Sequence, residues 1–104
     1  MNLFDLSGKT ALITGGNGGI GYGIAVGLAE AGAQIIISAR NNKKTKDAVD
    51  SLKSSGHQAL GIQVDVSDES SIKNMVSESL NSAGQVDILV NNAGIGIRKL
   101  PHEY

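Results

Sequence analysis

The sequence of 104 residues contains no cysteine, no long hydrophobic run and no excess of charge of one sign. Without cysteine, disulfide bonds and thiolate metal sites are excluded, and the redox compartment is left open. No segment approaches the roughly 18 consecutive apolar residues of a membrane-spanning helix, and the N-terminus lacks the apolar core of a signal peptide. We therefore expect neither membrane insertion nor export, and we expect a cytoplasmic protein.

The charged residues are almost balanced, with nine Lys and Arg against ten Asp and Glu and a formal net charge of -1. This balance predicts no general attraction to nucleic acid or to anionic membranes. The hydrophobic share of 40% is ordinary for a soluble globular domain. A chain of this length forms at most one domain, which can bury about two-thirds of the surface that the unfolded chain exposes.

Residues with catalytic or metal-binding chemistry are isolated. His57 and His102 have no carboxylate or histidine neighbour at metal-ligand spacing, so we interpret both as surface residues. Ser7, Ser38 and Ser67 do not lie in the elbow motif of a nucleophile. The sequence therefore indicates neither a hydrolase nor a metal site.

Short β-rich apolar runs alternate with segments of helical periodicity. Four strands are predicted, at residues 10–14, 34–38, 59–64 and 86–90. Strands that alternate with helices pair in parallel through right-handed crossovers. The prediction is an α/β fold of three layers with a parallel sheet in the strand order 3-2-1-4.

Three helices are predicted from apolar periodicity and from the glycines that follow it. The first is expected to end at Gly32, the lysine-rich second near Gly56 and the third at Gly84. The lysines of the second helix are interpreted as its solvated face. The apolar positions of the first helix are Ile20, Ile24, Leu28 and Ala31, and the third helix is lined by Ile72, Met75, Val76, Ser79, Leu80 and Ala83.

Five glycines fall within TGGNGGIG, residues 14–21, between the first strand and the first helix. Each glycine costs about 0.5–1 kcal/mol relative to alanine inside regular structure, so the cluster indicates a geometric or chemical requirement. Two registers fit: Gly16, Gly18 and Gly21 form G-x-G-x-x-G, and Gly15, Gly19 and Gly21 form T-G-x-x-x-G-x-G. The second is favoured, because the turn must begin directly after the strand and Gly15 then needs unusual backbone angles.

In either register the loop directs free backbone N–H groups and the positive end of a helix to one place, which suits a diphosphate. Gly19 would let a pyrophosphate approach closely, and Gly21 would let the helix pack against the first strand. Because the motif joins a strand to a helix within a βαβ unit, it indicates dinucleotide binding more than a purely structural turn.

The second strand is followed by Arg40, about 20 residues after Gly21, where an acidic residue would bind the ribose 2′-hydroxyl of NAD. A guanidinium instead pairs with a 2′-phosphate and stacks on adenine. Asn17 can add a hydrogen bond to that phosphate. The sequence therefore favours NADP over NAD, with a solvated turn residue as the alternative interpretation of Arg40.

These features together resemble the short-chain dehydrogenase/reductase family. The likeness is carried by Thr14-Gly15-x-x-x-Gly19-x-Gly21, by Asp65 after the third strand and by Asn91-Asn92-Ala93-Gly94 after the fourth. The order and spacing are those of the family, and the likeness covers nearly the whole chain. It implies a partial Rossmann-type fold, with residues 1–104 as the N-terminal portion of a single dinucleotide-binding domain.

The resemblance also implies roles for single residues. Asp65 would accept a hydrogen bond from the adenine amino group with Val66 packed beside the ring, and Asn91 would steady the central strands through its side chain. A helix-flanking acid and a plain turn are the alternatives for these two segments. The predicted cofactor-binding residues are Gly15, Asn17, Gly19, Ile20, Gly21, Arg40, Asp65, Val66, Asn92, Ala93 and Gly94.

Family members are more than twice this long, and their catalytic asparagine, serine and Tyr-x-x-x-Lys pair would fall beyond Tyr104. No catalytic residue is assigned, because Tyr104 has no following lysine to lower the pKa of its hydroxyl. The resemblance implies an NADP-dependent oxidoreductase that acts on a small alcohol or ketone and is a homo-oligomer at full length. The segment Gly94–Lys99 is similar to members that act on sugars or sugar acids.

The alternative function is a natural short chain that binds nucleotide, or pairs with another subunit, without catalysis. The fourth strand would then be a sheet edge, and an uncovered apolar edge at residues 87–90 invites aggregation or pairing. We therefore expect the N-terminal part of a longer enzyme. An in-frame continuation that encodes Tyr-x-x-x-Lys would distinguish the two.

Overall fold

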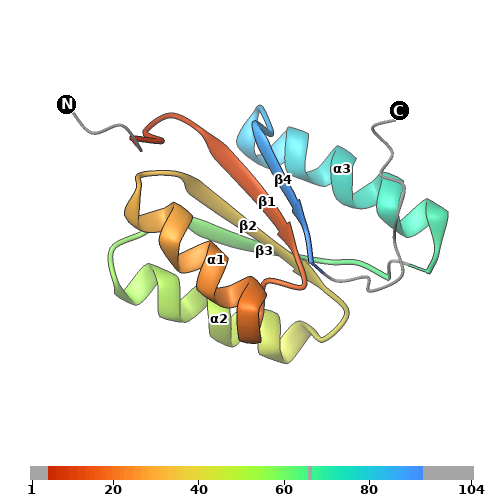
Figure 1. The fold of residues 1–104 in the computed structure, drawn as a ribbon. Coiled ribbons are helices and arrows are strands. Elements are labelled where there is room, and N and C mark those ends of the chain that lie inside the picture. The colour runs from red at the N-terminus through yellow and green to blue at the C-terminus, as the bar shows by residue number, and fades with distance from the viewer. Residues whose placement is uncertain (1–4, 66, 93–104) are drawn as a thin grey trace.

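The computed structural model describes residues 5–65 and 67–92, and in this part of the chain strands and helices alternate as predicted. The strands form one parallel sheet in the order β3-β2-β1-β4, with α1 and α2 on one face and α3 on the other (Figure 1). The predicted three-layer α/β fold is therefore confirmed. The strands are β1 (Thr10–Thr14), β2 (Gln34–Ala39), β3 (Ala59–Gln63) and β4 (Ile88–Asn91), and the helices are α1 (Gly19–Glu30), α2 (Asn42–Ser54) and α3 (Glu69–Ala83).

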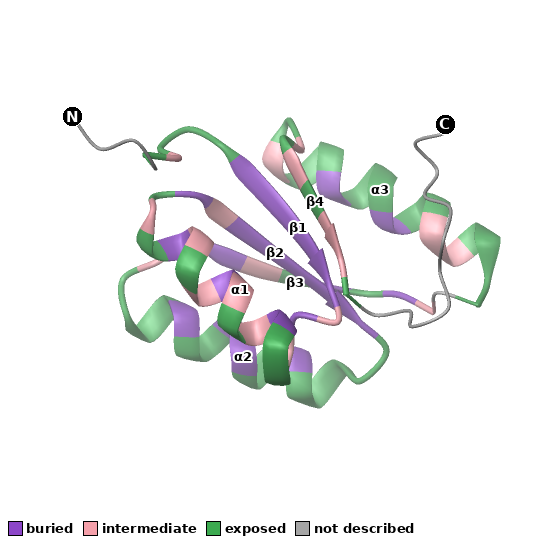
Figure 2. Cartoon of the chain, in the orientation of Figure 1, coloured by how far each residue is buried: buried purple, intermediate pink, exposed green. Residues whose placement is uncertain are grey.

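The central strands β1 and β2 are buried on both faces, because a parallel sheet in this fold has helices on both sides (Figure 2). Side chains alternate between two apolar layers. Ile13 and Ile37 pack under α1 and α2. Leu12 and Ile36 pack with Met75 of α3 on the opposite face. The sheet is therefore a rigid platform whose carboxyl edge presents the loops that follow each strand.

The buried face of α1 differs from the predicted one. Gly21, Ala25 and Ala29 form the buried stripe, one turn apart along the helix. The four positions predicted to line the core lie beside this stripe: Ile24, Leu28 and Ala31 are half-buried, and Ile20 is 78% exposed. The reason is steric, since small residues let the helix approach the sheet closely and the larger side chains are displaced to its flanks.

Helix α3 begins at Glu69, because Asp68 caps it by accepting a hydrogen bond from the Ser70 N–H at 2.9 Å. It ends as predicted at Gly84, whose φ of +82° is left-handed. The predicted apolar face is only partly buried. Met75 and Ser79 are buried, Ile72 and Ala83 are half-buried, and Val76 and Leu80 are 42% and 46% exposed.

Strand β4 is shorter than predicted. Asp87, the residue before it, forms a hydrogen bond with the first residue of β1. The Asp87 carboxylate accepts a hydrogen bond from the Thr10 N–H at 2.8 Å. On β4 itself, Leu89 pairs with Leu12 on the α3 face of the sheet. Leu89 is nevertheless 47% exposed, because α3 packs mainly over β3. Among the described residues, the β4 end of this face is the least covered part of the sheet.

Candidate nucleotide-binding site

The loop after β1 has the geometry of the second glycine register. Gly15 and Gly19 have φ of +72° and +56°, a left-handed conformation that favours glycine. Gly18 is extended instead, with φ of -175°. The Gly15 N–H donates to the Ser38 carbonyl of β2 at 2.7 Å, so the turn begins directly after the strand. The expectation that Gly15 adopts unusual backbone angles is confirmed.

Gly21 and Gly19 differ in the space around them. A Cβ atom on Gly21 would collide with the Gly15 carbonyl oxygen and would lie 2.6 Å from the Asn92 Nδ2 atom. Only glycine therefore lets α1 lie this close to the turn. A Cβ on Gly19 would meet nothing within 4 Å, so the surface above Gly19 is open. The loop thus packs tightly on its inner side and is bare on its outer side.

The N-terminus of α1 is also bare. Gly18 is its N-cap and makes no side-chain hydrogen bond, and the first turn contains no acidic residue. The first N–H groups of a helix have no partner within the helix, and here no side chain caps them. Backbone donors and the positive helix end therefore converge at the open surface of Gly19, which is the arrangement that binds phosphate.

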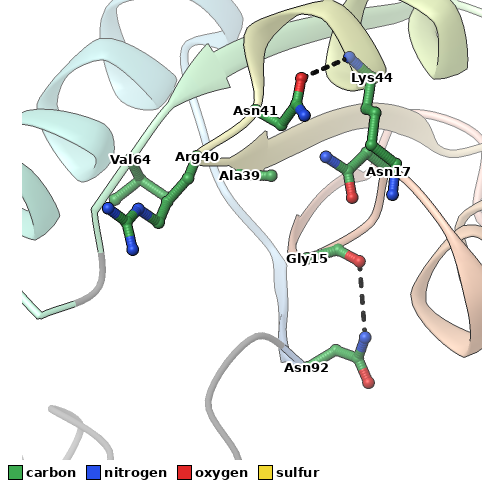
Figure 3. A pocket seen from close by; sticks show the side chains of 8 residues that line it. All are labelled: Gly15, Asn17, Ala39, Arg40, Asn41, Lys44, Val64 and Asn92. Carbon is green, nitrogen blue, oxygen red and sulfur yellow. Dashed lines mark hydrogen bonds between the residues drawn. The ribbon is translucent and has the colours of Figure 1, made fainter.

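A pocket of about 420 Å³ lies between this loop and the turn that follows β2 (Figure 3). Its walls come from the carboxyl ends of all four strands of the described sheet, where open α/β sheets bind ligands. The lining residues are Gly15, Asn17, Ala39, Arg40, Asn41, Lys44, Val64 and Asn92. Four residues of the predicted site, Gly15, Asn17, Arg40 and Asn92, are thus brought together in one pocket.

Arg40 and Asn17 lie on different sides of this pocket. In Figure 3, Arg40 lies beside Val64, whereas Asn17 lies beside Lys44. The Asn17 Nδ2 atom donates to the Thr45 hydroxyl at 3.4 Å, which ties the glycine loop to α2. The lysines of α2 are exposed, as predicted, and one of them, Lys44, also lines this pocket. Lys44 is one of the lining residues outside the predicted site, together with Ala39, Asn41 and Val64.

Asp65 lies next to Arg40 in a second cavity of about 380 Å³, which Gln63 and Ser71 also line. Its Oδ1 atom accepts hydrogen bonds from the Ser67 hydroxyl at 2.6 Å and from the Ser67 N–H at 3.0 Å. These bonds, with a smaller contribution from the Arg40 charge, hold the pKa of the Asp65 carboxyl below its ordinary value. Asp65 is therefore an ionised acceptor, and no described residue bonds its Oδ2 atom.

Asn91, the last residue of β4, and Asn92 directly after it connect β4 to β1. The Thr14 hydroxyl oxygen lies 3.1 Å from the Asn91 Oδ1 atom and accepts from the Asn92 N–H at 3.0 Å. The Asn92 side chain reaches the Gly15 carbonyl at 3.5 Å. These contacts are consistent with the steadying role that the resemblance implies for Asn91. Three residues of the predicted site, Val66, Ala93 and Gly94, lie outside the described residues.

The family profile described as short chain dehydrogenase matches residues 9–104. The chain belongs to the short-chain dehydrogenase family. The 2-dehydro-3-deoxy-D-gluconate 5-dehydrogenase of Dickeya dadantii (strain 3937) is 44% identical over 95 residues, which cover 91% of this chain and 37% of that protein.

Two solved structures are also similar to this chain. A metagenomic short-chain oxidoreductase in complex with NADP has a TM-score of 0.83 and 35% identity, over 88% of this chain and 42% of that one. The 2-keto-3-deoxy-D-gluconate dehydrogenase of Streptococcus agalactiae has a TM-score of 0.82 and 42% identity, over 97% of this chain and 38% of that one. The chain spans less than half the length of these short-chain dehydrogenases.

Within residues 5–65 and 67–92, no helix has the length and apolar character needed to cross a membrane. In the same residues, no group of three or more His, Asp or Glu side chains is arranged to hold a metal ion. The polar groups of the candidate site are the main-chain donors at the start of α1, the cations of Arg40 and Lys44 and the carboxylate of Asp65.

Proposed function

We propose that this chain is the cofactor-binding part of an NADP-dependent oxidoreductase, and that residues 1–104 form the N-terminal portion of a single dinucleotide-binding domain. The observation that carries the proposal is the bare main-chain surface at Gly19, which opens beside the uncapped start of α1. A side chain is absent where a pyrophosphate would approach, and backbone donors are present. The cofactor, when bound, supplies the hydride chemistry between nicotinamide and an alcohol or ketone.

The residues around the pocket fit the rest of a dinucleotide. Gly15, Gly19 and Gly21 shape the cradle, and Ile20, exposed at the start of α1, offers an apolar surface to the bound cofactor. Arg40 offers a guanidinium to the 2′-phosphate, and the ionised Asp65 beside it offers an acceptor to the adenine amino group. The roles of Asn17, Val66, Asn92, Ala93 and Gly94 stay predictions.

NADP is proposed in preference to NAD, because the residue at the end of β2 is a cation and not a carboxylate. A similar short-chain oxidoreductase whose structure is described as a complex with NADP supports this choice. For the complete enzyme we propose a sugar acid as the small-molecule substrate, supported by the names of two similar dehydrogenases. We further propose that it is cytoplasmic and a homo-oligomer.

Isothermal titration calorimetry with NADP⁺ and with NAD⁺ tests the proposed function. We expect binding of NADP⁺ with an affinity at least about tenfold higher than that of NAD⁺, since the Arg40 charge pairs with the extra phosphate. Absence of heat with both nucleotides would overturn dinucleotide binding, and equal affinities would overturn the NADP preference alone. Coding sequence downstream that encodes Tyr-x-x-x-Lys would distinguish the enzyme from a non-catalytic nucleotide-binding module.

A further inference from the structure

We infer that Lys44, in the first turn of α2, is a second cation for the 2′-phosphate and shares with Arg40 the selection of NADP. This inference rests on the proposed function and extends it to a residue outside the glycine motif. It starts from the position of Lys44 on the wall of the pocket, opposite the side where Arg40 lies beside Val64 (Figure 3).

The Lys44 ammonium lies above the glycine loop. The position that a Cβ atom would take on Gly18 is 3.7 Å from the Lys44 Nζ atom. Lys44 also lines a neighbouring cavity of about 310 Å³ with Asn17, Gly18 and Tyr22. Its charge therefore stands over the part of the loop between Asn17 and Gly18, within reach of a group bound in the main pocket.

The other lysines near the start of α2 are neutralised within the helix, and Lys44 is not. Lys43 pairs with Asp47 at 3.4 Å, and Lys46 pairs with Asp50 at 2.9 Å, each four residues along. The residue four positions after Lys44 is Ala48, which is buried. No ion pair involving Lys44 is found among the described residues. Its positive charge is therefore available to an anion in the pocket.

Two hydrogen bonds hold the start of α2 in place around Lys44. The Asn41 side chain caps the helix by accepting from the Lys44 N–H at 3.0 Å. The next residue, Thr45, is buried and accepts from the Asn17 side chain at 3.4 Å. The backbone of Lys44 is thus held on both sides, and its side chain extends to the glycine loop.

The location of Lys44 separates the 2′-phosphate from the pyrophosphate. The open main-chain surface that suits the pyrophosphate is at Gly19, at the start of α1. Lys44 lies in the first turn of α2, shortly after the carboxyl end of β2, which contacts the adenosine ribose in folds of this type. A cation in this position distinguishes NADP from NAD, whereas a cation on the pyrophosphate would strengthen the binding of both.

The test compares Lys44→Gln with Lys46→Gln, which removes the same charge from the same helix at a residue that lines a different cavity. The probes are adenosine 2′,5′-bisphosphate and adenosine 5′-monophosphate, which differ only in the 2′-phosphate, together with NADP⁺ and NAD⁺. For Lys44→Gln we expect the two ligands with a 2′-phosphate to bind roughly threefold to tenfold more weakly. The other two should change by less than about twofold, and Lys44→Arg should retain the selectivity.

Three outcomes would overturn the inference. Unchanged selectivity in Lys44→Gln would remove Lys44 from the site while leaving the proposed function intact. An equal loss for ligands with and without the 2′-phosphate would assign Lys44 to another phosphate. An equal loss in Lys46→Gln would show a general field effect and no direct contact. Failure of the unmodified protein to bind any of the four ligands would overturn the proposed function as well.

Discussion

The two segments that border the pocket offer different chemical groups to a ligand. The loop after β1, residues 15–19, presents main chain, with left-handed glycines and an uncapped helix start. The turn after β2 and the start of α2, residues 40–44, present the side chains of Arg40 and Lys44. A pyrophosphate is common to all dinucleotides, so a backbone surface suffices to bind it. A 2′-phosphate is present only in NADP, and charged side chains discriminate it.

The two turns also differ in how tightly their residues are constrained. Gly21 of α1 packs against the first loop, where a side chain would collide with the Gly15 carbonyl, so this contact tolerates little change. Arg40 is exposed, and its charge is partly screened by solvent. Substitutions in the first turn should therefore affect both coenzymes and the fold, whereas substitutions in the second should change the preference between coenzymes at little cost in stability.

The largest expected effect is in the second turn. Arg40→Asp replaces the cation proposed to face the 2′-phosphate with an anion, which would lose an attraction and add a repulsion. We expect the ratio of NADP⁺ to NAD⁺ affinity to fall by roughly 100-fold, measured by calorimetry. Lys73→Asp on the exposed surface of α3 makes the same change of charge at a residue that does not line the pocket and should leave the ratio unaltered. An unchanged ratio in Arg40→Asp would remove Arg40 from coenzyme selection.

Gly21→Ala tests how closely α1 packs against the first turn. The added methyl group must displace the Gly15 carbonyl and the Asn92 side chain, so we expect a loss of roughly 1–3 kcal/mol of unfolding free energy and weaker binding of both coenzymes. Gly23→Ala lies on the same helix with nothing within 4 Å of its Cβ and should stabilise the protein by up to about 1 kcal/mol. Similar denaturation midpoints for the two variants would contradict the close packing.

Gly19→Ala tests the open side of the same turn. Alanine at a left-handed residue costs about 1 kcal/mol, and its methyl group would occupy the surface proposed for the pyrophosphate. We expect roughly tenfold weaker binding of both coenzymes by calorimetry. Gly84→Ala places alanine at another left-handed glycine with open space around it, at the end of α3, and should cost similar stability without affecting binding. Equal binding by the two variants would exclude Gly19 from the cradle.

The smallest expected effect comes from the cap of α2. Asn41→Ala removes the acceptor for the Lys44 N–H and should cost about 1 kcal/mol of unfolding free energy. It should also weaken NADP⁺ binding by roughly twofold, since the start of α2 becomes less fixed beside Lys44. Asp68→Ala removes the equivalent cap of α3 and should change only the stability. Thermal unfolding and calorimetry of both variants would separate the two effects.

Local patterns in the sequence determined most of the fold. The buried runs of β1 and β2, the alternation with helices and the stop of α3 at Gly84 depend on neighbouring residues, and the structure confirms all three. The strand order follows from the handedness of the crossovers, which leaves few arrangements. The Gly15 register could also be predicted from the sequence, because the turn directly after the buried strand requires a positive φ at its first residue.

Tertiary structure decided which side chains of the helices are buried and which reach the pocket. Periodicity ranks positions by hydrophobicity, but the burial of α1 depends on how closely Gly21 lets it approach the loop, so Ile20 is exposed. In the sequence, nothing distinguishes Lys44 from the other lysines of α2. Its charge lies above Gly18 because α2 packs beside the glycine loop. Such contacts join residues far apart in the chain, so no local pattern in the sequence contains them.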